Sequence, residues 1–267
     1  MGMRYFTKQN RALITELVRT DFKLRYQGSV LGYAWSLLRP LLLFVILYIV
    51  FVNFLKVGTG VPHFPVYLLL GIVVWNFFNE MTTLSIDSIV RRGDLIRKIG
   101  IPKWIIIFSS SISSLINLAL NLLVVGIFLF INHVNLLSSI LWLPLILVEV
   151  YILALGVSLL LSAAFVKYRD VNYIWEVLMQ AGFYMTPIIY PISRITNVKL
   201  QEFIMINPMA QAIQDSRYAV VTHQSMTVYQ VFGGGWYKFI PFTIVLVIFV
   251  VGLQYFRKES KYFAENI

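Results

Sequence analysis

Charged residues are scarce in this sequence, and cysteine is absent altogether. Only 13% of the 267 residues are charged, whereas 59% are hydrophobic. A soluble domain of this length cannot bury so much apolar surface in one core, so the composition excludes a soluble protein and predicts several membrane spans. Without cysteine, the chain has neither a disulfide framework nor a thiolate metal site.

Histidine is also rare, and its three copies do not cluster. His63, His133 and His223 fall in three different predicted loops, so we expect no metal site. The chain has no nucleotide-binding loop, no serine or cysteine triad and no zinc-binding helix motif. Its first thirty residues are charged and precede several apolar segments, which argues against a cleavable signal peptide.

The first thirty residues have the pattern of a basic amphipathic helix. Between Arg4 and Tyr26, apolar residues recur on one half of the helical wheel. That half contains Leu13, Ile14, Leu17, Val18, Phe22 and Leu24. Asp21 and Arg25 interrupt it four residues apart, a spacing that predicts an ion pair along the helix. We expect this helix to lie in the headgroup region of the cytosolic membrane face.

Six apolar segments follow, each long enough to cross a bilayer. The first begins within Leu31–Leu41 and ends near Leu55, and the others are Val66–Leu84, Trp104–Ile131, Leu136–Val166, Val171–Pro191 and Phe239–Phe256. Lys and Arg accumulate on the cytosolic side of membrane proteins. An even number of spans places both termini on one side, and that side has 17 of the 22 Lys and Arg residues. Both termini are therefore expected in the cytosol.

The expected fold is an all-α integral membrane protein with a single transmembrane domain over residues 1–267. Residues 1–30 form the cytosolic interfacial helix, 31–191 the first five spans, and 192–237 an external loop. This loop is expected to contain helices at Val198–Ile206 and from Met209 to about Val221. Residues 238–256 form the sixth span and 257–267 a cytosolic tail.

The predicted fifth span ends in two proline breaks, at Thr186-Pro187 and Tyr190-Pro191. Lipid offers no hydrogen bonds to irregular backbone, so this end either lines a watery passage or packs as a kink inside protein. Aromatic rings in the spans fit either role, because sugars stack on ring faces and lipid or core packing uses the same residues. The candidate channel residues are Tyr48, Trp75, Phe78, Trp175, Phe183 and Tyr184.

The cytosolic loop Ser88–Trp104, SIVRRGDLIRKIGIPKW, combines dense charge with large aliphatic residues. A loop that only fixed topology would not need those aliphatics, so we interpret it as a short helix that docks on another protein. The candidate docking residues are Arg91, Arg92, Asp94, Leu95, Arg97 and Lys98.

One carboxylate, Glu149, is expected close to the middle of the membrane. An ionisable group there marks a functional site by default, although one that is hydrogen-bonded in helix packing is equally compatible with the sequence. Asn117 and Asn121 of the third span are its candidate partners.

Four stretches together resemble one family. They are DFKLRYQGSVLGYAWSLLRPLL (Asp21–Leu42), DLIRKIGIPKW (Asp94–Trp104), KYRDVNYIWEVLMQAGFYMTPIIYP (Lys167–Pro191) and INPMAQAIQ (Ile206–Gln214). The chain resembles the membrane subunit of ABC-2-type polysaccharide exporters, the permeases for O-antigen, capsule and teichoic acid chains. The resemblance covers nearly the whole length.

This resemblance implies a homodimer in the bacterial plasma membrane, bound to two copies of a separate ABC ATPase. A lipid-linked glycan would enter from the cytosol and leave through a channel at the dimer interface. The permease would need no catalytic residue and no cofactor of its own, because ATP and Mg would bind to the ATPase. Arg25, Arg39 and Arg169 could attract the lipid pyrophosphate, or could serve only to fix topology.

Two other classes of protein compete with this interpretation. A secondary transporter or channel would use mid-membrane polar groups such as Glu149 and would need no ATPase. A membrane-embedded glycosyltransferase or phosphotransferase would need a metal-diphosphate site, but no cytosolic loop combines the acidic and basic residues for one.

Overall fold

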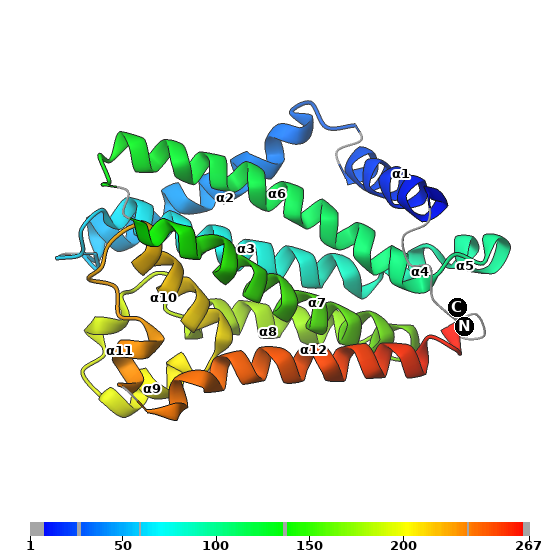
Figure 1. Cartoon of the computed structure of the whole chain (residues 1–267). Coiled ribbons are helices and arrows are strands. Elements are labelled where there is room, and N and C mark those ends of the chain that lie inside the picture. The colour runs from blue at the N-terminus through cyan, green and yellow to red at the C-terminus, as the bar shows by residue number, and fades with distance from the viewer. Residues whose placement is uncertain (1–7, 26–27, 59, 136–137, 234, 264–267) are drawn as a thin grey trace.

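A computed structural model describes residues 8–25, 28–58, 60–135, 138–233 and 235–263. This part of the chain is a bundle of helices without a β-strand (Figure 1). The end of the bundle with α1 (Lys8–Arg25), α4 (Ser88–Arg91) and α5 (Gly93–Ile99) is called the α5 end. The opposite end, called the α10 end, has α9 (Val198–Met205), α10 (Pro208–Val220) and α11 (Val228–Phe232).

Among the described residues, five helices are long and apolar enough to cross a membrane. They are α2 (Trp35–Leu47) continued by the π-helix η2 (Tyr48–Phe54), α3 (Phe64–Ile86), α6 (Lys103–Ile131), the 3-10 turn η3 (Ser138–Trp142) with α7 (Leu143–Lys167), and the 3-10 turn η5 (Trp236–Phe239) with α12 (Ile240–Glu259). Their bounds lie within a few residues of five predicted spans. The multi-span, all-helical class is therefore confirmed.

The predicted fifth span is shorter in the structure than in the sequence analysis. Helix α8 runs only from Val171 to Met185, 15 residues and about 22 Å, which falls short of a hydrocarbon core about 30 Å thick. It ends because Thr186 precedes a proline and adopts an extended conformation, with ψ at 137°. The count of six long spans is thus not reached by helix length alone.

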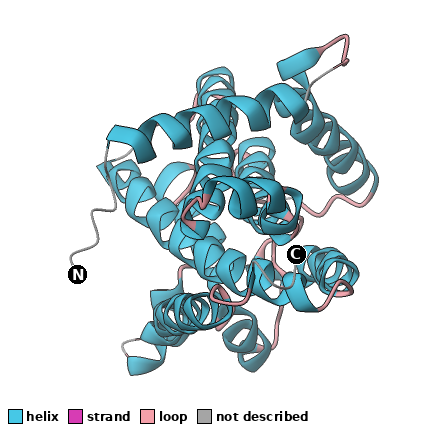
Figure 2. Ribbon diagram, turned by 90° about the vertical axis from the view of Figure 1, so that its right-hand side faces the viewer, coloured by secondary structure: helices cyan, strands magenta, loops and turns pink. Residues whose placement is uncertain are grey.

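Helix α3 is the core of the bundle. Its apolar window is 78% buried, against 11% to 39% for the other four long helices. A helix that is apolar on every side needs neighbours on every side, and α3 contacts α2, α6, α7, α8 and α10. Figure 2 looks onto the α5 end and shows the helices of the bundle packed around one another.

Helices α7 and α12 make a backbone contact at two glycines. A Cβ atom on Gly252 would overlap the carbonyl of Gly156, and one on Gly156 would meet the backbone of Phe249. Small residues at such a crossing let two membrane helices approach until their backbones touch. The sequence of both helices therefore fixes one crossing point with no side chain between them.

Helix α1 forms over Lys8–Arg25 and uses its apolar face for protein packing. Ile14 and Leu17 are buried against Ile101 and Ile105 at the start of α6. Leu24, predicted on the same face, is 63% exposed at the last turn. The centre of the apolar stripe thus contacts the α5–α6 corner.

The short helices at the α10 end begin at the residues that their sequences predict. The side chain of Asn197 caps α9 by accepting from the backbone N–H of Lys199 at 3.0 Å. Asn207 caps α10 in the same way, with the N–H of Met209 at 2.9 Å and a proline in the first turn. These two caps explain why α9 and α10 begin within a residue of their predicted starts.

Candidate functional site

At the α5 end, Arg92 joins three elements. It lies between α4 and α5 and forms an ion pair with Asp21 of α1. Its Nη1 also donates to Ser109 Oγ of α6 at 3.1 Å. The side chains of Arg92 and Asp21 are only 13% and 21% exposed. A displacement of the α4–α5 segment would therefore be transmitted directly to α1 and α6.

The partner of Asp21 differs from the predicted one, Arg25. Asp21 pairs with Arg92 instead, and the side chain of Arg25 lies outside the described part of the structure. The spacing in the sequence indicated a partner along the helix, but a cation 71 residues away reaches the same carboxylate.

The remaining docking residues divide into an exposed charged face and a packed aliphatic face. Arg91, Asp94, Arg97 and Lys98 are exposed. Leu95 is half-buried in a cluster with Ile14 and Leu17. Leu95 thus packs partly on the bundle itself, and docking of this loop on a partner protein stays a prediction.

Helix α5 itself is short and sharply bounded. Asp94 and Arg97, three residues apart, form an ion pair at 3.1 Å on its exposed side. Gly100 ends the helix in the left-handed conformation, with φ at 67°, which a side chain would disfavour. Helix α5 is therefore a short, charged projection at the α5 end, and Gly100 fixes where it stops.

Five of the six aromatic residues predicted to line a channel form a continuous row between α3 and α8. Trp75 lies 6.1 Å from Phe183, and Phe78 lies 6.2 Å from Trp175, measured between ring centroids. Trp175 Nε1 also donates to Thr82 Oγ1 at 3.1 Å. Phe183 in turn makes an edge contact with Tyr184 at 5.4 Å.

Burial separates these rings into different roles. Trp75 and Phe78 are almost fully buried in the core. Trp175 and Phe183 are half-buried, and Tyr184 is 64% exposed. In the single chain, a path for a sugar could therefore reach Tyr184 and the outer edges of Trp175 and Phe183, whereas Trp75 and Phe78 only support them. Tyr48 packs beside Phe44 at 5.8 Å, apart from this row.

The opposite side of α8 has no partner among the described residues. No residue of this helix is buried. The exposed residues on this side are Tyr173, Ile174, Glu176, Val177, Leu178, Gln180, Tyr184 and Met185. This α8 face is apolar and aromatic with two polar groups, Glu176 and Gln180.

The three arginines predicted to attract a pyrophosphate do not form one site in the described structure. Arg169 is exposed at the α5 end, two residues beyond α7, and its guanidinium lies 5.0 Å from the ring of Phe165. Arg39 is exposed on α2 one turn after Ser36, whose carbonyl accepts from Asn121. Asn121 lies about 27 Å along α6 from its start, so Arg39 is far from the α5 end. The side chain of Arg25 is not described.

Glu149 lies about one helical turn from the middle of the span Ser138–Lys167, and its partner is a residue other than the two predicted. It is six residues into α7, about 9 Å from Leu143. Its Oε2 accepts from Gln211 Nε2 of α10 at 3.4 Å. Neither predicted asparagine is that partner, because Asn117 donates to Glu80 at 2.6 Å and Asn121 to the carbonyl of Asn117 at 2.8 Å.

Helix α10 carries two more ionisable groups that sequence reasoning did not single out. Asp215 Oδ2 accepts from Gln211 Nε2 at 2.7 Å, so one amide bridges the carboxylates of Asp215 and Glu149. Burial raises the pKa of Asp215. Arg217 is completely buried, and its fork of donors reaches α3 and the segment after α8. One signal was present: Arg217 follows Ile213 by four residues, which places it on the apolar stripe of α10.

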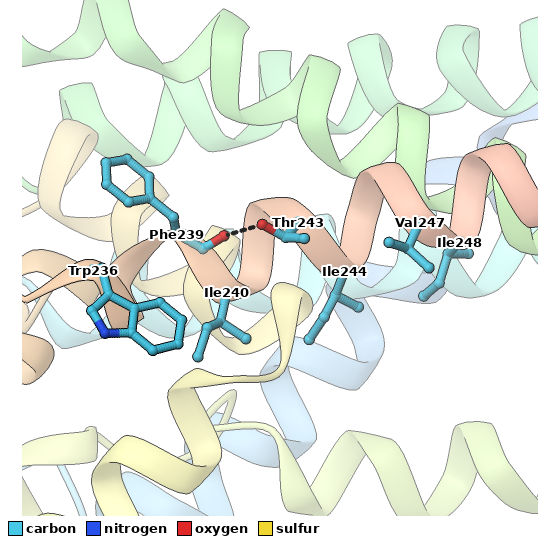
Figure 3. A pocket seen from close by; sticks show the side chains of 7 residues that line it. All are labelled: Trp236, Phe239, Ile240, Thr243, Ile244, Val247 and Ile248. Atoms are coloured by element: carbon cyan, nitrogen blue, oxygen red, sulfur yellow. Dashed lines mark hydrogen bonds between the residues drawn. The ribbon is translucent and has the colours of Figure 1, made fainter.

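A groove of about 260 Å³ runs along α12. It is separate from the row of aromatic residues between α3 and α8. Figure 3 shows its lining residues, which are Trp236, Phe239, Ile240, Thr243, Ile244, Val247 and Ile248. The hydroxyl of Thr243 already donates to the carbonyl of Phe239 at 2.9 Å. The lining therefore suits an apolar chain rather than the hydroxyl groups of a sugar.

Known proteins are similar to this chain over most of its length. The ABC-2 type transporter family matches residues 12–221. An O-antigen export system permease protein RfbA of Klebsiella pneumoniae is 29% identical over 258 residues, which cover 95% of this chain and 94% of that protein. The RfbA permease of Myxococcus xanthus is 27% identical over 81% of the chain and 83% of its own length. The polysialic acid transport protein KpsM of Escherichia coli is 22% identical, with 79% and 82% coverage.

Proposed function

Because the chain belongs to the ABC-2 type transporter family, we propose that it is the membrane permease subunit of an ATP-driven exporter of a lipid-linked polysaccharide. The observation that carries the proposal is the likeness to O-antigen export permeases over 95% of the chain. Polysialic acid transport by a further relative supports the same class of cargo. O-antigen, capsule and teichoic acid chains are the members of that class.

The permease acts with a separate ATPase subunit, which binds ATP and Mg. In this proposal, ATP-driven closure of two ATPase subunits pushes on the exposed charges of α4 and α5, namely Arg91, Asp94, Arg97 and Lys98. Arg92 then passes the motion to Asp21 of α1 and to Ser109 of α6. The half-buried packing of Leu95 on α1 keeps the two helices moving together.

The proposed orientation places the α5 end in the cytosol of a bacterium and the α10 end outside the plasma membrane. Support comes from the excess of Lys and Arg at the α5 end. Helix α8 then makes a sixth crossing, together with the irregular residues 186–190 that follow it. Helix α1 lies in the cytosolic headgroup layer with its exposed basic side facing lipid phosphates.

The glycan path follows the aromatic row of α8 in a homodimer. The α8 face exposes apolar residues along its whole length, which a second copy covers in the assembled transporter. Tyr184, Trp175 and Phe183 then offer ring faces to successive sugars. Glu176 and Gln180 supply acceptors and donors for hydroxyl groups, and Arg169 at the α5 end meets the pyrophosphate of the lipid carrier.

Co-purification and reconstitution test this function. The permease is expressed with a candidate ABC ATPase subunit, purified, and placed in liposomes with a lipid-linked glycan on one side. We expect a stoichiometric complex and glycan transfer that needs ATP hydrolysis. Transport driven by an ion gradient without an ATPase would instead establish a secondary transporter or channel.

A further inference from the structure

Among the described residues, Arg217 is one of the largest fully buried side chains, and its charge has no carboxylate partner within 4 Å. A guanidinium stays protonated even in an apolar site. Here, the charge is met by oriented carbonyl groups and by an aromatic ring. The guanidinium carbon lies 3.7 Å from the centroid of Tyr67, a cation–π contact with α3.

The carbonyls that Arg217 binds are those released by the end of α8. Its Nη1 donates to Pro187 O at 2.5 Å and its Nη2 to Ile188 O at 2.6 Å. Residues 186–189 are buried but have no helical geometry, so their carbonyls need partners from elsewhere. Arg217 supplies two of those partners. Its Nε donates to Tyr67 O of α3 at 2.9 Å, so one side chain bridges α10, α3 and the end of α8.

Helix α3 is shaped to admit this side chain. A Cβ atom on Gly71 would overlap Nη2 of Arg217, so only glycine leaves room for the guanidinium there. The ring of Tyr67 is held in turn by α10, because its hydroxyl donates to Gln214 Oε1 at 3.2 Å. The slot formed by Gly71 and Tyr67 thus fixes the fork of Arg217 in one position.

The position of this fork determines where the outer part of α8 lies. Trp175 anchors α8 to α3 near one end through Thr82. At the other end Gly182 lies directly against Trp75, and the Arg217 contacts follow within six residues. We propose that Arg217 is a positioning residue for export, a clamp that holds the unwound end of α8 on α3 and so sets Phe183 and Tyr184 at the glycan path. This inference deepens the proposed function and rests on it.

The test compares variants in the complete permease–ATPase complex in liposomes. Gly71→Ala keeps Arg217 but displaces its guanidinium, and Arg217→Lys keeps the charge but loses the fork. Gly126→Ala is the matched control, because a Cβ atom there meets nothing within 4 Å. Two quantities are measured: glycan exported per ATP hydrolysed, and the rate at which a membrane-impermeant maleimide labels the permease in a Met185→Cys background. This label is specific because the chain has no other cysteine.

We expect Gly71→Ala and Arg217→Lys each to change the labelling rate at position 185 and to lower export per ATP by about five-fold or more. Gly126→Ala leaves both quantities unchanged. A clamp that served folding alone would reduce the amount of folded complex without changing either quantity in the folded fraction. That result, or a failure of both variants to assemble at all, would overturn the proposal. If the unmodified complex exports no glycan while labelling still responds to Gly71→Ala, the proposed function is wrong and the clamp stands.

Discussion

The carboxylate of Asp215 lies in a buried site of α10 and accepts a hydrogen bond at each oxygen. The donors are Gln211 Nε2 at 2.7 Å and the backbone N–H of Val228 at 3.3 Å. Burial disfavours the charged form and raises the pKa of Asp215 above its value in the unfolded chain. The folded protein therefore binds this proton more tightly, and stability falls as pH rises from the unfolded pKa, about 3.9, to the raised folded value.

We predict that Asp215→Asn flattens this pH dependence. Each unit by which the folded pKa is raised costs about 1.4 kcal/mol once the pH exceeds both values, and the neutral amide removes that cost. Melting of the purified protein in detergent, followed from about pH 4 to about pH 8, measures the effect. Asp170→Asn, at an exposed carboxylate after α7, should leave the profile unchanged. Parallel profiles for Asp215→Asn and the unmodified protein would contradict the prediction.

A second prediction at this scale concerns Asp21 and Arg92. Because both side chains are mostly buried, each single charge reversal should destabilise the protein and uncouple ATP hydrolysis from export. The double reversal, Asp21→Arg with Arg92→Asp, should recover about 1–3 kcal/mol of the loss in a mutant cycle. The same cycle at the exposed pair Asp94–Arg97 should give about 0.2–1 kcal/mol. Equal coupling energies at the two pairs would show that Arg92 does not link the α4–α5 segment to α1.

Single residues were the hardest feature to predict from sequence. Glu149 was recognised as an acid within a span, but its partner comes from α10, which the sequence placed in a distant external loop. Arg217 was counted only as one of the few cations outside the cytosolic loops. Its burial depends on Gly71 and on carbonyls of residues 187 and 188, and no local pattern joins these three positions.

At the scale of elements, helix α5 separates docking from packing. We predict that Asp94→Ala with Arg97→Ala lowers ATP-driven export while melting is almost unchanged, because both side chains are exposed. Leu95→Asp should instead lower stability, since Leu95 packs against α1 and α6. Export and melting temperature, measured on the same preparations, distinguish the two. Unchanged export in the Asp94/Arg97 variant would remove α5 from the coupling path.

On helix α8, the proposed glycan path and the packing on α3 depend on different residues. Tyr184→Ala should reduce glycan flux per folded dimer with little loss of stability, because Tyr184 is exposed. Trp175→Ala should cost about 2 kcal/mol, less than the roughly 3–5 kcal/mol of a fully buried aromatic residue because Trp175 is only half-buried. Part of this cost is the lost hydrogen bond to Thr82. A fall of flux that merely follows stability in both variants would exclude Tyr184 from the path.

The elements themselves were largely predictable, and the exception has a local cause. Sequence periodicity and length located α3, α6, α7 and α12, and the sequence also placed the starts of α9 and α10 within a residue. The length of α8 was overestimated because hydropathy continues through residues 186–190 although the helix does not. Proline at position 187 was noticed, yet the buried partners that let the chain unwind there are tertiary.

For the whole molecule, the distribution of basic residues predicts the orientation. Reporter domains fused after Lys261 should be found in the cytosol, and reporters inserted near His223 should be found outside. Protease accessibility in intact cells and in inverted vesicles gives independent measurements of the same two positions. If both positions lie on one side, α12 does not cross the membrane and the six-span topology is wrong.

The glycine contact between α7 and α12 has a consequence for how such a molecule could move. At Gly156 and Gly252 the two backbones touch, so neither helix can slide or roll without collision. We expect α7 and α12 to move as one unit, whereas α2, the least buried of the five long helices, has less packing to break when it moves. A covalent bridge that locked α7 to α12 is therefore expected to leave the transport cycle running.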